Sequence, residues 1–266
     1  MAKHAVYVVA QTLGNGLRGS DMHNIMLIPG NMCDERLWLP VAEELAAVGH
    51  NVQIAPRLEQ STISSMAEAV LSATNEPIVV IGFSMGAIVA AEMAHRAPSR
   101  VKALGLIAFN ASADLPERAV VRPRQQDAVL SGQLSHIVAD ELKPNYLAAA
   151  NRTDDDLLNT VMQMALTLGP EVFVAQSEAL RLRDDLRPVL PHFTMPVLLA
   201  CGTEDRLCPP DWHKQWAQLI GTNAKFIELA HAGHLLPIEQ PYALADALKH
   251  WLTEETSCPK KSGLPM

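Results

Sequence analysis

A serine that stands between two glycines has the sequence surroundings of a catalytic nucleophile. The segment Gly82-Phe83-Ser84-Met85-Gly86 follows an apolar run and precedes a helical pattern, which is the context that a G-x-S-x-G turn requires. Glycines are needed there because a side chain would meet neighbouring backbone. The turn places the Ser84 hydroxyl at the carboxyl edge of a sheet, at the positive end of the next helix. We therefore expect Ser84 to be a catalytic nucleophile.

A serine hydroxyl needs a base within hydrogen-bond reach at neutral pH. Where a G-x-S-x-G turn carries the nucleophile, the chain order is serine, acid, histidine. His234 stands after the last apolar run and directly behind Gly233, so we expect it to be the general base. His231, just before it, is the alternative base.

The acid should follow the preceding strand, where Glu204 and Asp205 come shortly after Gly202. We expect Asp205 to receive the imidazole N–H, hold its tautomer and stabilise the imidazolium without taking the proton. Glu204 remains the alternative acid, and its other interpretation is a solvated loop charge.

Acyl transfer also needs donors for a tetrahedral oxyanion. We assign the backbone N–H groups of Met85 and Asn31, the latter in the loop after an early apolar run. Substrate contacts are predicted for Met32, Phe109 and Phe173. The four widely spaced cysteines form no zinc pattern, and we expect neither a metal nor a cofactor.

Short apolar runs that alternate with amphipathic helices must position these groups. This alternation is typical of a mostly parallel, doubly wound α/β sheet. Strands are predicted over 5–10, 25–28, 52–55, 78–81, 101–109, 197–201 and 225–229, and helices over 37–48, 64–74, 85–97, 210–219 and 242–252.

The alternation breaks over 111–193, where helix starts near Asp114, Thr153 and Gly169 occur without a convincing strand. We interpret this block as a helical lid inserted into a core formed by 1–110 and 194–256, with a disordered tail over 257–266. The alternative is that these helices only flank the sheet.

The lid is expected to set substrate choice through a mainly apolar pocket with at most one or two charged contacts. Arg122 and Arg124 could meet an anionic substrate group or a carrier protein, or could simply be solvated. An apolar roof is predicted from Met162, Met164, Leu166, Leu168 and Phe173.

Composition narrows the classes of protein. A net charge of −8 and the absence of a basic stripe argue against nucleic acid. No apolar run approaches a bilayer span of roughly 18 residues, and no signal peptide is evident. We expect a cytoplasmic protein with free thiols and a small-molecule substrate, a monomer or small homo-oligomer without membrane contact.

Together these residues resemble the α/β-hydrolase superfamily over nearly the whole chain. The matches are the 30–38 oxyanion segment, the G-x-x-D-x-x-x-P pattern at Gly202, Asp205 and Pro209, and Gly233-His234 followed by 239–241. The segments 66–71, 185–187 and 195–196 resemble small cytoplasmic carboxylesterases such as the pimeloyl-[acyl-carrier protein] methyl ester esterases.

Two segments depart from the superfamily pattern. Pro29 stands where many relatives have histidine, and 55–59 replaces the usual D-x-x-G-x-G-x-S turn. The oxyanion loop is therefore expected to be held differently.

The resemblance implies a serine hydrolase that cleaves an ester through an acyl-enzyme. Lactonase, thioesterase, amidase and carbon–carbon bond hydrolase use the same triad, and cofactor-independent dioxygenases share the fold. Haloalkane dehalogenase is disfavoured because it needs a carboxylate nucleophile where Ser84 stands. The alternative from another class is a small-molecule receptor or regulator on the same scaffold.

Overall fold

The computed structural model describes residues 7–8, 22–142 and 146–257. Within them a seven-stranded sheet has the order β1-β3-β2-β4-β5-β6-β7. Only β1 is antiparallel to its neighbour, and the other pairs are parallel. The strands are β1 (Tyr7–Val8), β2 (Asn24–Ile28), β3 (Asn51–Ile54), β4 (Ile78–Phe83), β5 (Val101–Ile107), β6 (Val197–Gly202) and β7 (Ala224–Leu229).

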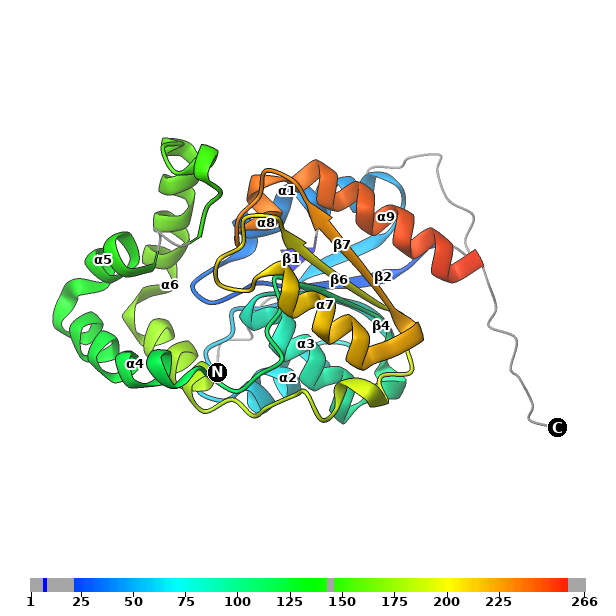
Figure 1. Ribbon diagram of the computed structural model, residues 1–266, viewed down its shortest axis with the longest axis horizontal. Helices are drawn as coiled ribbons and strands as arrows, with labels where there is room; N and C mark the ends of the chain where they lie inside the picture. Colours follow the sequence, from blue (N-terminus) through cyan, green and yellow to red (C-terminus); the bar gives the residue numbers. More distant parts are fainter. Residues whose placement is uncertain (1–6, 9–21, 143–145, 258–266) are drawn as a thin grey trace.

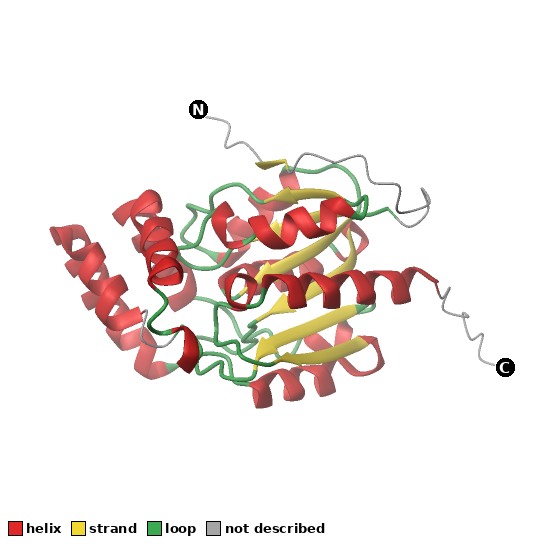
Figure 2. Ribbon diagram, turned by 90° about the horizontal axis from the view of Figure 1, so that it is seen from above, coloured by secondary structure: helices red, strands yellow, loops and turns green. Residues whose placement is uncertain are grey.

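Helices cover both faces of the sheet (Figure 2). One hydrophobic cluster packs α1 (Leu39–Ala47) and α9 (Pro241–Ser257) on one face. A second cluster packs α2 (Ile63–Ser72), α3 (Met85–Arg96) and α7 (Pro210–Ile220) on the other. Every residue of β4 and β6 is buried, as expected of parallel strands that lack a solvent face. The doubly wound α/β sheet predicted from the sequence is confirmed.

The chain between β5 and β6 is helical in its described part and contains no strand there. In Figure 1 its helices lie to one side of the sheet. They are α4 (Pro116–Ala128), α5 (Leu134–His136) and α6 (Asp155–Arg181), with π-helical turns over Val129–Gln133 and Ile137–Leu142. The remaining short elements are α8 (Leu236–Glu239) and 3-10 turns over Glu35–Leu37, Pro98–Arg100, Ala149–Asn151, Leu190–His192 and Gly221–Asn223.

Helix α6 is divided at Gly169, where the sequence predicts a helix start. Gly169 has φ 83°, a left-handed conformation, and Pro170 follows it. By length and composition α6 is the one described helix that could cross a membrane. The break shortens each continuous segment, and side chains such as Met164 and Phe173 are buried against protein.

Two sequence-based expectations fall partly outside the described residues. Of the strand predicted over 5–10, only Tyr7 and Val8 are described, and they pair with Ile54 and Gln53 of β3. The tail predicted over 257–266 lies outside the described residues, except for Ser257 at the end of α9.

The turn between β4 and α3 depends on two glycines at close backbone approaches. A Cβ on Gly86 would overlap the carbonyl oxygens of Ile28 and Pro29, and one on Gly82 would overlap the backbone of Gly86. Neither neighbour is a flexible side chain that could move aside. The sequence therefore needs glycine on both sides of Ser84 for packing reasons.

We predict that Gly86→Ala lowers the free energy of unfolding by about 3 kcal/mol or more, because overpacking against backbone forces the sheet and helix apart. The matched control is Gly132→Ala, where a Cβ would meet nothing within 4 Å and only the left-handed φ of 88° opposes the change. That variant should lose about 1–2 kcal/mol. Urea denaturation of both proteins measures the difference, and equal losses would contradict the packing argument.

Candidate active site

Ser84 is held in a strained backbone conformation between β4 and α3. Its φ of 51° and ψ of −114° lie outside the usual regions for a residue with a side chain. The Ser84 N–H donates to the carbonyl oxygen of Ile107 at 2.8 Å, which fixes the turn to the neighbouring strand β5. The hydroxyl is thereby presented to a cavity rather than packed into the helix.

A continuous hydrogen-bonded path joins Ser84, His234 and Asp205. His234 Nε2 lies 3.0 Å from Ser84 Oγ, and His234 Nδ1 lies 2.9 Å from Asp205 Oδ2. A carboxylate can only accept, so Nδ1 carries the proton and Nε2 is free to accept from the serine. His234 is 5% exposed and Asp205 is 3% exposed. The structure therefore brings together the three residues that the sequence selected.

The Asp205 carboxylate is kept ionised by its surroundings. Burial raises its pKa, but the charge and hydrogen bond of His234 and the N–H groups of Cys208 and Leu207 outweigh burial and lower it. Both backbone groups donate to Asp205 Oδ1 at 2.8 Å. One oxygen is thus fixed by the turn, and the other faces the imidazole.

The alternative acid and base lie elsewhere. Glu204 accepts a hydrogen bond from the N–H of Ala149 at 2.8 Å, so its carboxylate ties the loop to the lid. His231 is exposed and does not line the cavity at Ser84. The geometry favours Asp205 and His234 over both.

The loop that carries His234 is attached directly to the inserted segment. The N–H of His234 donates to the carbonyl oxygen of Tyr146 at 2.7 Å. The buried Glu239 carboxylate accepts from the N–H groups of Gly233 at 2.9 Å and Ala148 at 2.7 Å. Burial raises the pKa of Glu239, and these hydrogen bonds oppose the rise. The carboxylate therefore links the histidine loop to the chain entering α6.

A buried histidine supports the acid loop. His213 Nδ1 lies 3.2 Å from the carbonyl oxygen of Pro209, and the N–H of Phe109 donates to His213 Nε2 at 2.8 Å. Because a carbonyl can only accept, Nδ1 carries the proton and the ring is neutral. Burial lowers the pKa of His213 to about 4. This contact fastens the end of β5 to the start of α7, just after the Asp205 turn.

The two expected oxyanion donors line the cavity beside Ser84. Within the described residues neither the N–H of Met85, at the start of α3, nor the N–H of Asn31 has a hydrogen-bond acceptor. An N–H group in the first turn of a helix has no acceptor within the helix. Both donors are therefore available to a developing negative charge.

A lid glutamine holds the Asn31 loop in place. Gln176 Oε1 accepts from the N–H of Met32 at 2.8 Å and from Asn31 Nδ2 at 3.2 Å, and its Nε2 donates to the carbonyl oxygen of Leu58 at 2.9 Å. Met32 adopts φ 53° in this turn. Gln176 is 2% exposed, and both ends of its amide have partners. Gln176 thus supports the loop that follows Pro29.

The cavity next to Ser84 has a volume of about 300 Å³ and a mainly apolar wall that also carries several charged side chains. The expectation of a mainly apolar pocket is confirmed, but the expectation of at most one or two charged contacts is wrong. Five charged side chains line it: Glu117, Arg118 and Arg122 from α4, Glu141 from the turn Ile137–Leu142, and Arg183 from the chain after α6.

Met32, Phe109 and Phe173 do not line this cavity, which corrects their prediction as substrate contacts. The left-handed turn directs Met32 into a cluster with Phe173 between lid elements. Phe109 is fully buried in the core on the α3 face of the sheet. None of the other residues predicted for an apolar roof lines the cavity either: Met162, Met164, Leu166 and Leu168.

Comparisons with known proteins agree with this architecture. Residues 25–247 match the model of the alpha/beta hydrolase family. The chain belongs to that family. This α/β hydrolase is therefore an enzyme of the hydrolase class, and the resemblance noted in the sequence is confirmed.

Three relatives illustrate its similarity. A putative carbamate hydrolase, RutD, of Yersinia enterocolitica is 26% identical over 68% of this chain and 64% of its own length, slightly under two thirds. A pimeloyl-[acyl-carrier protein] methyl ester esterase of Neisseria meningitidis is 27% identical over 85% of this chain and 75% of its own. A solved esterase from Thermogutta terrifontis, with malate bound, is 26% identical with a TM-score of 0.84, over 95% and 93% of the two chains.

One group of possible metal ligands occurs among the described residues of the hydrolase. A ligand atom from each of Asp205, Cys208 and His234 lies within 4.8 Å of the others. Two of these groups already bond each other, and burial raises the pKa of the Cys208 thiol well above 9.0. Because a metal binds the thiolate, this set suits a hydrogen-bonded pair better than an ion.

We predict that Gln176→Leu lowers kcat about tenfold with little change in KM, because a loosened Asn31 loop weakens only oxyanion stabilisation. The matched control is Gln126→Leu, which removes an amide that donates to Ser177 on the same lid at 3.2 Å. Steady-state kinetics on one ester should show the loss in the first variant alone. An unchanged kcat for Gln176→Leu would remove the glutamine from any role in positioning the loop.

We predict that stability falls by ~2 kcal/mol between pH 7.5 and pH 5 because of His213. Its pKa is lowered from 6.5 to about 4 in the folded protein, so the unfolded chain binds the proton more readily. The contribution is complete above pH 6.5 and is lost as the pH falls towards 4.

Urea denaturation at several pH values measures this slope. His213→Gln should be less stable at pH 7.5 but should show a flatter dependence on pH. His95→Gln, which changes an exposed histidine, should retain the slope of the unmodified protein. Part of the slope should remain in His213→Gln, because burial also lowers the pKa of His50 to about 4. A slope that is unchanged in His213→Gln would remove His213 from the explanation.

Proposed function

We propose that this α/β hydrolase cleaves carboxylic esters of small to medium substrates through a covalent intermediate on Ser84. The observation that carries the proposal is the continuous path from Ser84 Oγ through His234 to Asp205, with distances of 3.0 and 2.9 Å. The path opens on a cavity that also contains two backbone donors without acceptors among the described residues. A nucleophile, a base and oxyanion donors that share one cavity constitute a complete acyl-transfer site.

In the first half-reaction Ser84 Oγ attacks the ester carbonyl carbon while its proton passes to His234 Nε2. The carbonyl oxygen becomes an oxyanion and accepts from the N–H groups of Asn31 and Met85. Asp205 stabilises the imidazolium across the 2.9 Å contact. When the C–O bond to the alcohol breaks, the leaving oxygen takes the proton from His234.

In the second half-reaction a water molecule attacks the acyl-enzyme and gives its proton to His234. The tetrahedral intermediate collapses, the acid product leaves, and the Ser84 oxygen recovers the proton. The net change is one ester and one water converted to one acid and one alcohol. Neither step uses a metal or a cofactor.

Esters are the favoured substrates because two of the relatives are named as esterases. The same residues could cleave a lactone, thioester, amide or carbon–carbon bond, and the carbamate hydrolase named among the relatives makes a carbamate a further candidate. A receptor would not need the aligned serine, imidazole and carboxylate, so this geometry favours an enzyme.

The proposed setting is a reducing cytoplasm with a small-molecule substrate. Cys33, Cys201 and Cys208 are all buried and free, as expected of a protein without structural disulfides. The cavity of about 300 Å³ accepts a small molecule, and a carrier protein could deliver one. A monomer or small homo-oligomer remains our expectation.

We predict that Ser84→Ala lowers kcat by roughly 10⁴-fold or more, since the nucleophile acts as one unit with its base. A fluorophosphonate should label the unmodified protein at Ser84, as located by peptide mass spectrometry, and should not label the variant. The control is Ser131→Ala, which removes an exposed lid serine and should retain both labelling and hydrolysis. Unimpaired p-nitrophenyl ester hydrolysis by Ser84→Ala would refute the proposed nucleophile.

A further inference from the structure

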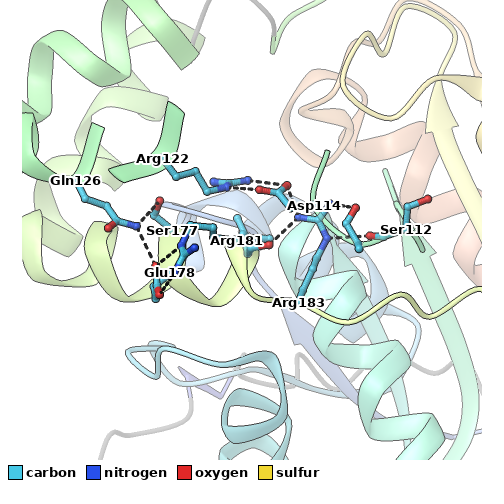
Figure 3. Close-up of polar contacts among 10 residues, drawn as sticks. Ser112, Asp114, Arg122, Gln126, Ser177, Glu178, Arg181 and Arg183 are labelled. Atoms are coloured by element: carbon cyan, nitrogen blue, oxygen red, sulfur yellow. Dashed lines mark hydrogen bonds and ion pairs between the residues drawn. The ribbon is translucent and has the colours of Figure 1, made fainter. Parts of the chain in front are cut away.

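The charged wall of the cavity is built around one shared carboxylate. Arg122 Nε donates to Asp114 Oδ2 at 2.6 Å, and Arg183 Nη1 donates to Asp114 Oδ1 at 2.7 Å. Figure 3 shows the two guanidinium groups meeting at Asp114, one from α4 and one from the chain after α6. The single negative charge of Asp114 is therefore the counter-ion for two positive charges, those of Arg122 and Arg183.

This arrangement is rigid and mostly removed from water. The side chains of Asp114 and Arg183 are 1% and 4% exposed, and that of Arg122 is 15% exposed. Burial raises the pKa of Asp114, but the two arginines more than offset this and lower it. Asp114 thus stays ionised, and one positive charge in the wall remains without a counter-ion.

Arg118 adds a second uncompensated positive charge. It lies one helical turn before Arg122 on α4, so both side chains share one face of the helix. No hydrogen bond or ion pair to the guanidinium of Arg118 is found within the described part of the chain. Burial raises the pKa of both the Tyr146 phenol and the Cys208 thiol, and the charge of Arg118 opposes both rises. The guanidinium therefore acts on two groups that line the same cavity as Ser84.

An unmatched donor lines the same cavity. Asn110 is 5% exposed, and its Oδ1 accepts from the N–H of Ser112 at 2.9 Å. That bond orients the amide and leaves the buried Nδ2 without an acceptor in the described structure. A buried donor without a partner is unfavourable, so an acceptor from a ligand at this position would relieve that cost.

The negative charges of the wall do not cancel this set. Glu141 is paired with Arg124 at 2.5 Å and also accepts from Gln125 Nε2 at 2.8 Å. Glu117 lies in the first turn of α4 and is exposed. The charges of Glu141 and Arg124 cancel each other. The remaining positive charges of Arg118, Arg122 and Arg183 exceed the negative charges of Asp114 and Glu117 by one, so the described wall carries one net positive charge.

We propose that the cavity selects esters that also carry a carboxylate, which Arg118 and the Nδ2 of Asn110 contact. This inference rests on the proposed esterase function and specifies its substrate class. A carboxylate matches the single net charge of the wall, and its oxygens suit the guanidinium and amide donors. Hydrolysis of such a monoester, with water, yields an alcohol and a second carboxylic acid group.

The test uses pairs of esters that differ only in this charge. Monomethyl adipate is compared with its monoamide analogue, in which a carboxamide replaces the carboxylate on the acyl side. Acetoxyacetate is compared with acetoxyacetamide, which places the charge on the alcohol side. The unmodified enzyme should prefer the charged member of at least one pair by about tenfold or more in kcat/KM.

Three variants separate recognition from general damage. Arg118→Gln should lower kcat/KM for the preferred charged ester roughly ten- to hundredfold, mainly through KM, and change the neutral partner less than about threefold. Glu117→Gln removes a negative charge from the wall and should raise kcat/KM for the charged ester without raising it for the neutral partner. Arg96→Gln removes an arginine paired with Glu68 outside the cavity and should change neither member.

A binding measurement makes the inference independent of turnover. Calorimetry should detect binding of the preferred charged ester to Ser84→Ala, with at least tenfold weaker binding to Ser84→Ala/Arg118→Gln. The carboxylate site would be overturned if the unmodified enzyme had equal kcat/KM for charged and neutral esters. It would also be overturned if Arg118→Gln lowered kcat/KM equally for both. If no ester is hydrolysed and Ser84 resists the fluorophosphonate, the proposed function fails, while the binding comparison still decides the carboxylate site.

Discussion

The backbone approach beneath Ser84 is the constraint on which the rest of the site depends. Gly86 lets α3 start against the carbonyl of Ile28 in β2, and Gly82 lets β4 turn sharply into that helix. This packing supports the left-handed Ser84, with φ 51°, at a strain that typically costs about 1–3 kcal/mol. The hydroxyl, the N–H of Met85 and the start of α3 all take their positions from this one turn.

The chain between β5 and β6 helps to position the loops around Ser84. Gln176 from α6 holds the Asn31 loop, and Tyr146 accepts from the N–H of His234. Glu239 then joins the histidine loop to Ala148. The loops that carry Asn31 and His234 are thus positioned by groups from between β5 and β6. Treating core and lid as independent units would miss these contacts, which link substrate cover and chemistry physically.

The sequence predicted the features that are encoded locally. Ser84, Asp205 and His234 each follow a strand and stand beside turn glycines, so their places at one sheet edge could be inferred from the chain alone. Glu239 lies in the pattern of Gly233-His234 followed by 239–241, but the pattern alone does not indicate that its carboxylate links Gly233 to Ala148. These predictions succeeded because neighbours in sequence determine the geometry.

Other features depend on how helices rotate against one another, and periodicity does not encode that. Gln176 looks like an ordinary polar residue on α6 until Met32 is found opposite its amide. Of the apolar residues predicted for a roof, Met162, Leu168 and Phe173 pack with other lid residues. Met164 packs in the core cluster and Leu166 is exposed. The cavity instead receives polar residues of α4 such as Arg118. Side-chain hydrophobicity identified a buried surface but not the neighbour against which it is buried.

The break in α6 at Gly169 has a consequence for how the family can vary in length. An inserted residue rotates every following position of a continuous α-helix by about 100°, which would carry Gln176 away from Met32. The left-handed Gly169 and the following Pro170 interrupt that transmission. Insertions or deletions before Gly169 can therefore be absorbed locally. Relatives should be free to remodel the first half of α6 while the second half keeps its register on the oxyanion loop.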